Sequence, residues 1–275
     1  MTAKTQITSA LAQEYRENGV VILRNALSRE WLNLVETGIK RNLKSPGPFA
    51  GTYYEGQPGA FFDDYCNYDS IVEYRMLVQH SPLADMMQAL LETERLWLFY
   101  EQIFIKDGGG RRTPWHQDSP YFNAEGQQFC SAWISVDPAA GEDAFEIVAG
   151  SHRGPLYSGA VWETDNGAAV WHGETATERL PEIPKVDEER DKWNIISCDV
   201  EPGDIVVFHP SVLHGGGGVR KGGRRRTLAI RFFGDDVRYV KRPGQVLPPF
   251  YGLAEALKPG DPLRHPYFPQ LKGPA

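Results

Sequence analysis

The chain has 275 residues, of which 41% are hydrophobic and 12% aromatic, enough for one large packed domain or two small ones. Its formal net charge of −7 argues against nucleic-acid binding, because duplex binders carry a surplus of basic side chains. The three cysteines are far apart and include no CxxC pair, which argues against a disulfide framework and favours a reducing compartment.

The amino terminus, MTAKTQITSA, lacks the apolar segment of a secretory signal peptide, and the chain contains no run of about 18 apolar residues. We therefore expect a cytoplasmic protein that neither crosses a membrane nor binds nucleic acid. The expected partner is a small-molecule substrate, and the sequence leaves the oligomeric state open.

Two amphipathic helices are predicted near the amino terminus. Apolar residues recur every three to four positions over residues 5–18 and 29–43, the spacing that places them on one helical face. Gly19 is expected to end the first helix, and Ser28 to cap the second. Residues 20–23 are all apolar and predict a short buried strand between the helices.

The next segments predict a loop and a third helix. Residues 45–69 are rich in proline, glycine and aromatic side chains. This composition predicts an ordered loop over a pocket, because disordered segments contain few aromatic residues. Residues 70–93 predict one helix with its apolar residues inside.

From residue 96 onward the pattern changes to strands, at 97–106, 130–136, 145–148, 203–209, from 212 onward and at 226–233. Residues 155–195 are irregular and indicate an insertion or lid, and the proline-rich residues 242–275 are expected to wrap the surface. Helices followed by many short strands predict an α+β chain with a mainly β core, whose catalytic half is a sandwich or barrel.

The segment Trp115-His-Gln-Asp118 is a candidate metal site. His116 and Asp118 are two residues apart, so in an extended strand both side chains project from one face. His214 ends a strand and opens a glycine-rich loop, which makes it the best third ligand. Two histidines and one carboxylate form the facial triad of non-haem Fe(II) oxygenases, with positions left open for a chelator and oxygen. Because a bare HxD pair often occurs by chance, the surrounding residues carry the prediction.

Arg225 follows His214 by eleven residues, at the mouth of a strand that also carries Thr227 on the same face. A guanidinium can hold a carboxylate with two parallel hydrogen bonds, and a hydroxyl can add another. This pair predicts a site for the far carboxylate of a dicarboxylic cosubstrate. The adjacent Arg224 and Arg226 are expected to be solvated.

Together these residues resemble the phytanoyl-CoA dioxygenase-like (PhyH) family of Fe(II)- and 2-oxoglutarate-dependent oxygenases. The resemblance spans about residues 8–240 and is carried, in this order, by YRENGVVILRNAL, LWLFYEQIFIKDGGG, TPWHQDSPYF, CSAWISVDPAAGEDAFEIVAGSHRG, EPGDIVVFHPSVLHGGGG and RRRTLAIRF. It implies a double-stranded β-helix, the cupin-like jelly roll, with flanking N-terminal helices. We therefore expect a single domain over residues 1–275: a helical part to residue 95, a jelly-roll core over 96–240 and a tail from 241.

The resemblance also implies the reaction and its metal. Oxygen and 2-oxoglutarate become CO2 and succinate, while a C–H bond of a small-molecule substrate is hydroxylated. The family's iron ligands match His116, Asp118 and His214. Halogenating relatives lack the carboxylate ligand, so Asp118 favours hydroxylation or another oxidation.

The family's cosubstrate residues match by position as well. Arg225 matches the arginine that binds the distal carboxylate of 2-oxoglutarate, Trp133 a tryptophan that lines the cosubstrate pocket, and Gln102 a position that commonly touches the cosubstrate. Two residues after the distal histidine the family often has a serine, where this chain has Gly216. One hydrogen bond is then missing, or Thr227 replaces it.

Substrate residues are predicted from position alone. Tyr121, three residues after Asp118, is expected close to the iron, and Arg231 alternates with Thr227 along the last strand, so it could point inward. The aromatic loop is expected to supply a lid or wall over the substrate. Phe62 is the substrate residue predicted there, and Phe61, Tyr53 and Tyr54 could belong to the same wall.

Other functions remain open at this point. The same three ligands could hold zinc, which accepts two histidines, a carboxylate and a water, in a metal- or ligand-binding jelly roll without oxygenase activity. Arg225 argues against that alternative, because zinc hydrolysis does not need it. A structural jelly roll with a dead site is disfavoured, since all three ligands and the arginine are intact. The sequence does not choose between an acyl-CoA, an amino acid, a phosphonate and a secondary metabolite as the substrate.

Overall fold

The computed structural model describes residues 6–53, 60–158, 161–164, 167–170, 180–242 and 246–274, with only the backbone for 161–164 and 167–170. The N-terminal helices are α1 (Ser9–Asn18), α2 (Arg29–Lys44), α3 (Val72–His80) and α4 (Leu83–Leu90). None of the described helices is long and apolar enough to cross a membrane.

The helix ends mostly follow the local sequence. Gly19 ends α1 in the left-handed conformation, at φ 71°, as predicted. Ser28 occupies the N-cap position of α2, as predicted, although its side chain makes no capping hydrogen bond. The single helix expected over 70–93 is two helices, because Pro82 between them lacks the N–H group that a continuous helix needs.

One large antiparallel sheet forms the centre of the molecule, in the order β1-β12-β7-β14-β4-β3-β2, with β16 paired to β4. Its strands are β1 (Val20–Leu23), β2 (Gly51–Tyr53), β3 (Phe61–Tyr65), β4 (Leu96–Asp107), β7 (Phe129–Ser135), β12 (Ile205–Phe208), β14 (Arg224–Phe233) and β16 (Gln270–Lys272). The sheet therefore includes strands from all three predicted parts of the chain.

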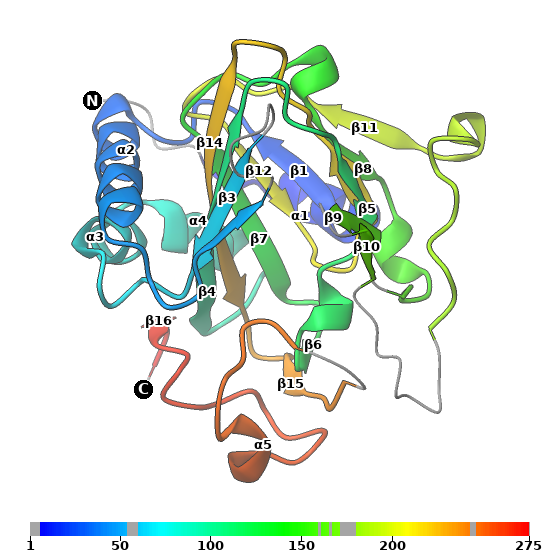
Figure 1. The fold of residues 1–275 in the computed structure, drawn as a ribbon. Coiled ribbons are helices and arrows are strands. Elements are labelled where there is room, and N and C mark those ends of the chain that lie inside the picture. Colours follow the sequence, from blue (N-terminus) through cyan, green and yellow to red (C-terminus); the bar gives the residue numbers. More distant parts are fainter. Residues whose placement is uncertain are drawn as a thin grey trace.

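A second, smaller sheet has the order β11-β8-β13-β5. Its strands are β5 (Thr113–His116), β8 (Phe145–Val148), β11 (Ile195–Cys198) and β13 (His214–Gly216). Figure 1 shows α2 and α3 on one side of the large sheet and the small sheet on the other. This is the predicted jelly roll with flanking helices.

The remaining elements are short. Two further strand pairs are β9 (Val161–Thr164) with β10 (Gly167–Val170), and β6 (Ala124–Glu125) with β15 (Arg238–Tyr239). The 3-10 turns are η1 (Ser119–Tyr121), η2 (Gly141–Asp143), η3 (Ser151–Arg153) and η4 (Arg190–Lys192), and α5 (Leu253–Ala256) lies in the tail.

Three expectations for irregular segments were incomplete. The aromatic loop expected over 45–69 contains β2 and β3, which extend the large sheet, in keeping with the strand preference of Phe and Tyr. The expected insertion over 155–195 contains the β9–β10 pair. The tail contributes β16 to the large sheet rather than only covering the surface.

Strand β14 explains how the sheet separates the core from the cavity. Side chains alternate along a strand, and Leu228 and Ile230 point into the core that the sheet shares with the helices. Thr227, Ala229 and Arg231 point the other way and line a cavity. From Thr227 to Arg231 the strand is therefore polar or small on the cavity face and apolar on the core face.

Candidate functional site

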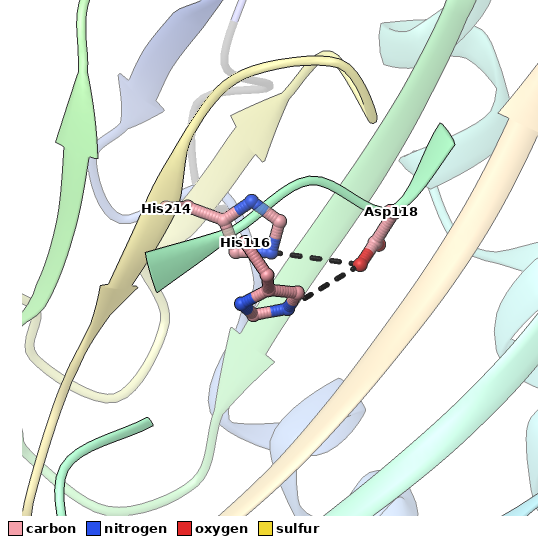
Figure 2. A group of neighbouring side chains, drawn as sticks. All are labelled: His116, Asp118 and His214. Carbon is pink, nitrogen blue, oxygen red and sulfur yellow. Dashed lines mark ion pairs between the residues drawn. The ribbon is translucent and has the colours of Figure 1, made fainter. Parts of the chain in front are cut away.

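The predicted metal ligands lie together at the small sheet. β5 and β13 are antiparallel neighbours in which His116 and His214 are direct partners, and Asp118 follows just after the end of β5. Asp118 Oδ1 lies 3.6 Å from Nε2 of each histidine, as the dashed lines in Figure 2 show. One ligand atom from each residue falls within 4.8 Å of the others, so the three can reach one ion.

The backbone fixes the tautomer of both histidines. Nδ1 lies 2.9 Å from the Pro114 carbonyl oxygen in His116 and 2.9 Å from the Val212 carbonyl oxygen in His214. A carbonyl oxygen only accepts hydrogen bonds, so Nδ1–H is the donor in each case. In each ring the lone pair is therefore on Nε2, which lies on the side of Asp118, the arrangement in which histidine binds a metal.

The charges of the cluster fit a divalent cation. Burial and the neighbouring His214 ring lower the pKa of His116 to about 3, so its imidazole is neutral. Burial opposes ionisation of Asp118, but Arg231 and the two histidines hold its pKa below the usual range. Metal ligands must be deprotonated, and the lowered pKa values of His116 and Asp118 favour that state.

Arg231 holds the second oxygen of the same carboxylate. Its Nη2 lies 3.1 Å from Asp118 Oδ2, and both side chains are almost fully buried. The guanidinium also lies over the Tyr100 ring, 4.4 Å from its centroid. With Oδ2 bound in this way, Oδ1 is the oxygen presented to the two histidines.

Arg225 is a buried cation that pairs with no carboxylate among the described residues. Its Nη1 donates to the Asp143 carbonyl oxygen at 2.7 Å and its Nη2 to that of Gly217 at 2.7 Å. Burial lowers its pKa to about 10. Burial also lowers the pKa of Lys106, a nearby cavity residue, to about 7. A buried guanidinium that is held only by neutral groups, with a buried lysine nearby, makes this end of the cavity attractive to an anion.

The glycine run after His214 shapes this end. Gly216 has φ +77° and Gly217 has φ +61°, conformations that other residues rarely adopt. A Cβ on Gly217 would lie 2.5 Å from Arg225 Nη1. A serine at position 216 would be strained here, and the backbone of the run contacts the guanidinium directly.

A cavity of about 520 Å³, within the usual size of small-molecule sites, brings the predicted residues together. The predicted site residues that line it are His116, Asp118, His214, Arg225, Gln102, Trp133, Thr227, Tyr121 and Arg231. The sequence prediction thus placed metal ligands, cosubstrate residues and two candidate substrate residues around one space.

Some predicted contacts already have partners within the protein. The Thr227 hydroxyl donates to the Phe104 carbonyl oxygen at 3.2 Å, so its proton is not free for a carboxylate. Gln102 Nε2 donates to Asp63 Oδ2 at 2.9 Å. Trp133 stacks on Phe145 with ring centroids 5.5 Å apart.

The prediction for Phe62 was wrong. Along β3, Phe61 and Asp63 line the cavity, whereas Phe62 packs against the core on the opposite face. Because the side-chain period of a strand is two, a shift of one residue changes the face. Tyr53 lines the cavity and is 44% exposed, and Tyr54 lies outside the described residues.

The two arginines beside Arg225 differ from each other. Arg224 is exposed and pairs with Asp107 at 3.1 Å, close to the expected solvated side chain. The same expectation was wrong for Arg226, which is largely buried and pairs with Asp137 at 2.6 Å.

Sequence reasoning missed several cavity residues. Tyr100, Phe104 and Lys106 alternate with Gln102 along β4 and share its face, so the strand period could have identified them. Leu247 reaches the cavity from the tail, where its backbone N–H donates to the Tyr121 carbonyl oxygen at 2.9 Å. No local sequence pattern marks that contact.

Comparison with known proteins places these residues in context. The family model "Phytanoyl-CoA dioxygenase (PhyH)" matches residues 15–227. A probable phytanoyl-CoA dioxygenase of Caenorhabditis elegans is 25% identical over 265 residues, covering 84% of this chain and 77% of that protein. The peroxisomal phytanoyl-CoA dioxygenase of Rattus norvegicus is 25% identical over 136 residues, covering 48% of this chain and 37% of the rat protein.

Solved structures share the fold over nearly the whole chain. The non-heme alpha ketoglutarate dependent carbocyclase SnoK from nogalamycin biosynthesis has a TM-score of 0.72 at 20% identity, covering 98% of this chain and 99% of SnoK. EctD from S. alaskensis, solved with 2-oxoglutarate and 5-hydroxyectoine, has a TM-score of 0.66 at 17% identity, covering 95% of this chain and 87% of EctD.

Proposed function

Because the chain belongs to the phytanoyl-CoA dioxygenase family, and is thus a 2-oxoglutarate-dependent dioxygenase that uses Fe(II) and oxygen, we propose that it hydroxylates a C–H bond of a small-molecule substrate. The products from the cosubstrate are succinate and CO2. The observation that supports this proposal is the single cavity that joins the His116, Asp118 and His214 cluster to the buried cation Arg225.

In this proposal His116, Asp118 and His214 hold the iron. Bound there with 2-oxoglutarate, Fe(II) supplies the activation of oxygen. The Pro114 and Val212 carbonyls keep the two imidazoles oriented, because each Nδ1–H is bound in place. Such outer hydrogen bonds fix the ring orientation and raise ligand basicity.

Arg231 is the positioning residue of the carboxylate. By binding Asp118 Oδ2, it turns Oδ1 toward the two Nε2 atoms and keeps the carboxyl ionised. Its own charge is compensated by Asp118, so it adds no free cation to the cavity.

Arg225 binds the distal carboxylate of 2-oxoglutarate. A guanidinium carries more N–H groups than its bonds to the Asp143 and Gly217 carbonyls use, so donors remain for a carboxylate. Lys106 adds positive charge at the same end, and Trp133 provides an apolar wall below the guanidinium, 5.7 Å away. Because these groups are buried, a dianion is stabilised more than it would be at the surface.

An anaerobic titration tests this function. Addition of Fe(II) and 2-oxoglutarate should produce a visible charge-transfer band that Asp118→Ala abolishes, and air should then yield succinate. A succinate-release screen over a substrate library identifies the substrate. No band and no succinate with Fe(II), together with tight retention of zinc, would instead support a zinc-binding jelly roll.

A further inference from the structure

Two neighbouring aspartates on β3 face opposite ways and have different surroundings. Asp64 is buried on the helix side, where its carboxylate accepts hydrogen bonds from Asn42 Nδ2 and from the backbone N–H groups of Gly47 and Tyr65. Asp63 lines the cavity. The two residues are adjacent on one strand, yet Asp64 accepts three hydrogen bonds, whereas Asp63 accepts one from a side chain.

Asp63 receives one side-chain hydrogen bond, from Gln102 Nε2 at 2.9 Å. No cationic side chain in the described part of the chain pairs with it, and burial raises its pKa to about 7. A carboxyl that is partly buried and has spare acceptor capacity is unfavourable unless a donor arrives. The cavity is the side from which such a donor can come.

We propose that Asp63 and Gln102 form the acceptor site for the primary substrate, and that the substrate carries a hydrogen-bond donor, a hydroxyl or an amine, at this point. The inference rests on the proposed oxygenase function and adds the chemistry of its substrate. Because Gln102 gives its amide N–H to Asp63, the pair offers oxygen atoms to the cavity.

The walls around the pair are aromatic. Phe61 stacks on Phe104 with ring centroids 6.1 Å apart, and Tyr65 meets Tyr100 edge-on at 6.2 Å. All four rings line the cavity. An apolar site with a few placed polar groups is typical of small-molecule recognition, and the polar groups decide orientation. The substrate is therefore a partly apolar molecule with its donor directed at Asp63.

The two ends of the cavity thus favour different ligands: one end offers hydrogen-bond donors to the cosubstrate, and the other offers acceptors to the primary substrate. On β14 and β4, Arg225 and Lys106 supply donors and positive charge, which suits the carboxylate of the cosubstrate. On β3 and β4, Asp63 and Gln102 supply acceptors, which repel a carboxylate. A dicarboxylate placed in the acceptor site would leave like charges together, so the two ligands do not exchange sites.

The test uses three probes with the same number of heavy atoms: 2-phenylethanol, 2-phenylethylamine and propylbenzene. Each is titrated anaerobically into protein loaded with Fe(II) and 2-oxoglutarate, and binding is followed by calorimetry and by the shift of the charge-transfer band. We expect at least one donor probe to bind roughly tenfold or more tightly than propylbenzene, the scale of one buried hydrogen bond to a charged group.

Variants connect that preference to Asp63. Asp63→Ala should bring the ratio of donor probe to propylbenzene close to one, and Asp63→Leu, which also lacks an acceptor, serves as a second variant if the alanine protein folds poorly. Asp69→Asn, an exposed aspartate outside the cavity, is the matched control and should keep the wild-type ratio. The ratio is taken within each protein, so a general loss of stability does not imitate the effect.

The outcomes separate the inference from the proposed function. A band without any preference for a donor probe, or a preference that survives Asp63→Ala, overturns the acceptor site and leaves the oxygenase function standing. Absence of the band contradicts the function itself. The ratio between amine and alcohol tells whether the donor is charged or neutral.

Discussion

The small sheet and the large sheet contribute to the cavity by different physical means. On the small sheet, His116 and His214 are direct strand partners whose rings are fixed by backbone carbonyls. On the large sheet, Arg225 and Arg231 are long side chains on one strand face, and they act by charge. The first arrangement depends on ligand geometry and the second on electrostatics. Changes in the small sheet should therefore abolish function, whereas changes in the large sheet should weaken it by degrees.

The largest effect is expected from removing a ligand of the small sheet. His214→Gln keeps a polar side chain of similar length but lacks the imidazole Nε2 that faces Asp118. We expect the purified protein to retain no Fe(II) after anaerobic desalting and to form no succinate. Metal analysis and a succinate assay measure this. The control is His80→Gln, which changes an exposed histidine. If His214→Gln still bound iron, loss of a small-sheet ligand would not abolish function as expected.

The next effect concerns the cosubstrate end of the large sheet. Arg225→Met removes a buried cation, and loss of one partner from a buried charged pair costs about 2–5 kcal/mol. We expect the Kd for 2-oxoglutarate to rise accordingly while Fe(II) still binds. Calorimetric titration of the Fe(II)-loaded protein with 2-oxoglutarate gives the Kd, and metal analysis of the same protein gives its Fe(II) content. Arg224→Met changes the exposed neighbour on the same strand and should leave the Kd unchanged. An unchanged Kd in Arg225→Met would contradict the assigned role.

A smaller effect should appear where the two sheets meet. Arg231→Met frees Asp118 Oδ2, and loss of an outer-sphere partner typically weakens metal binding by roughly 10- to 100-fold. Arg231→Lys should recover part of the affinity. Titration with Co(II), followed by its visible absorption, reports both affinity and ligand geometry. Wild-type affinity and spectrum in Arg231→Met would show that Asp118 is positioned without the large sheet.

The smallest effect is a pH-dependent change in stability at Asp63. Its folded pKa of about 7 lies above the value of an unfolded aspartate, so ionisation costs stability as the pH rises, and the cost is complete above about pH 7. Asp63→Asn should therefore melt higher than wild type at pH 8 and similarly near pH 4. Each kcal/mol corresponds to about 2–4 °C in a protein of this size class.

Calorimetry across that pH range, on protein without added metal, checks the sign. Asp69→Asn should show no such trend. A constant difference between Asp63→Asn and wild type at every pH would mean that burial of the charge is not the cause. That result would also mean that Asp63 does not differ, in the cost of its charge, from Asp64, which accepts hydrogen bonds on the opposite face.

Local sequence determined much of the fold and of the metal site. Runs of strand-forming residues bounded by turn residues predicted β4, β7, β8 and β14 close to their observed bounds, because those strands depend on patterns within a few residues. The two-residue spacing of His116 and Asp118 likewise predicted a shared face. His214 and Arg225 were predicted from their places at a strand end and a strand start, and the resemblance to the family matched the same two residues.

Only the tertiary structure decided which other residues line the cavity. Asp63 and Phe62 differ by one position on β3, and only the pairing of β3 with β4 determined which of them faces inward. Leu247 reaches the site through a backbone hydrogen bond to a residue more than a hundred positions earlier in the chain. Sequence patterns report which residues share a face of one element, whereas contacts between distant segments depend on register and chain path, which no local pattern encodes.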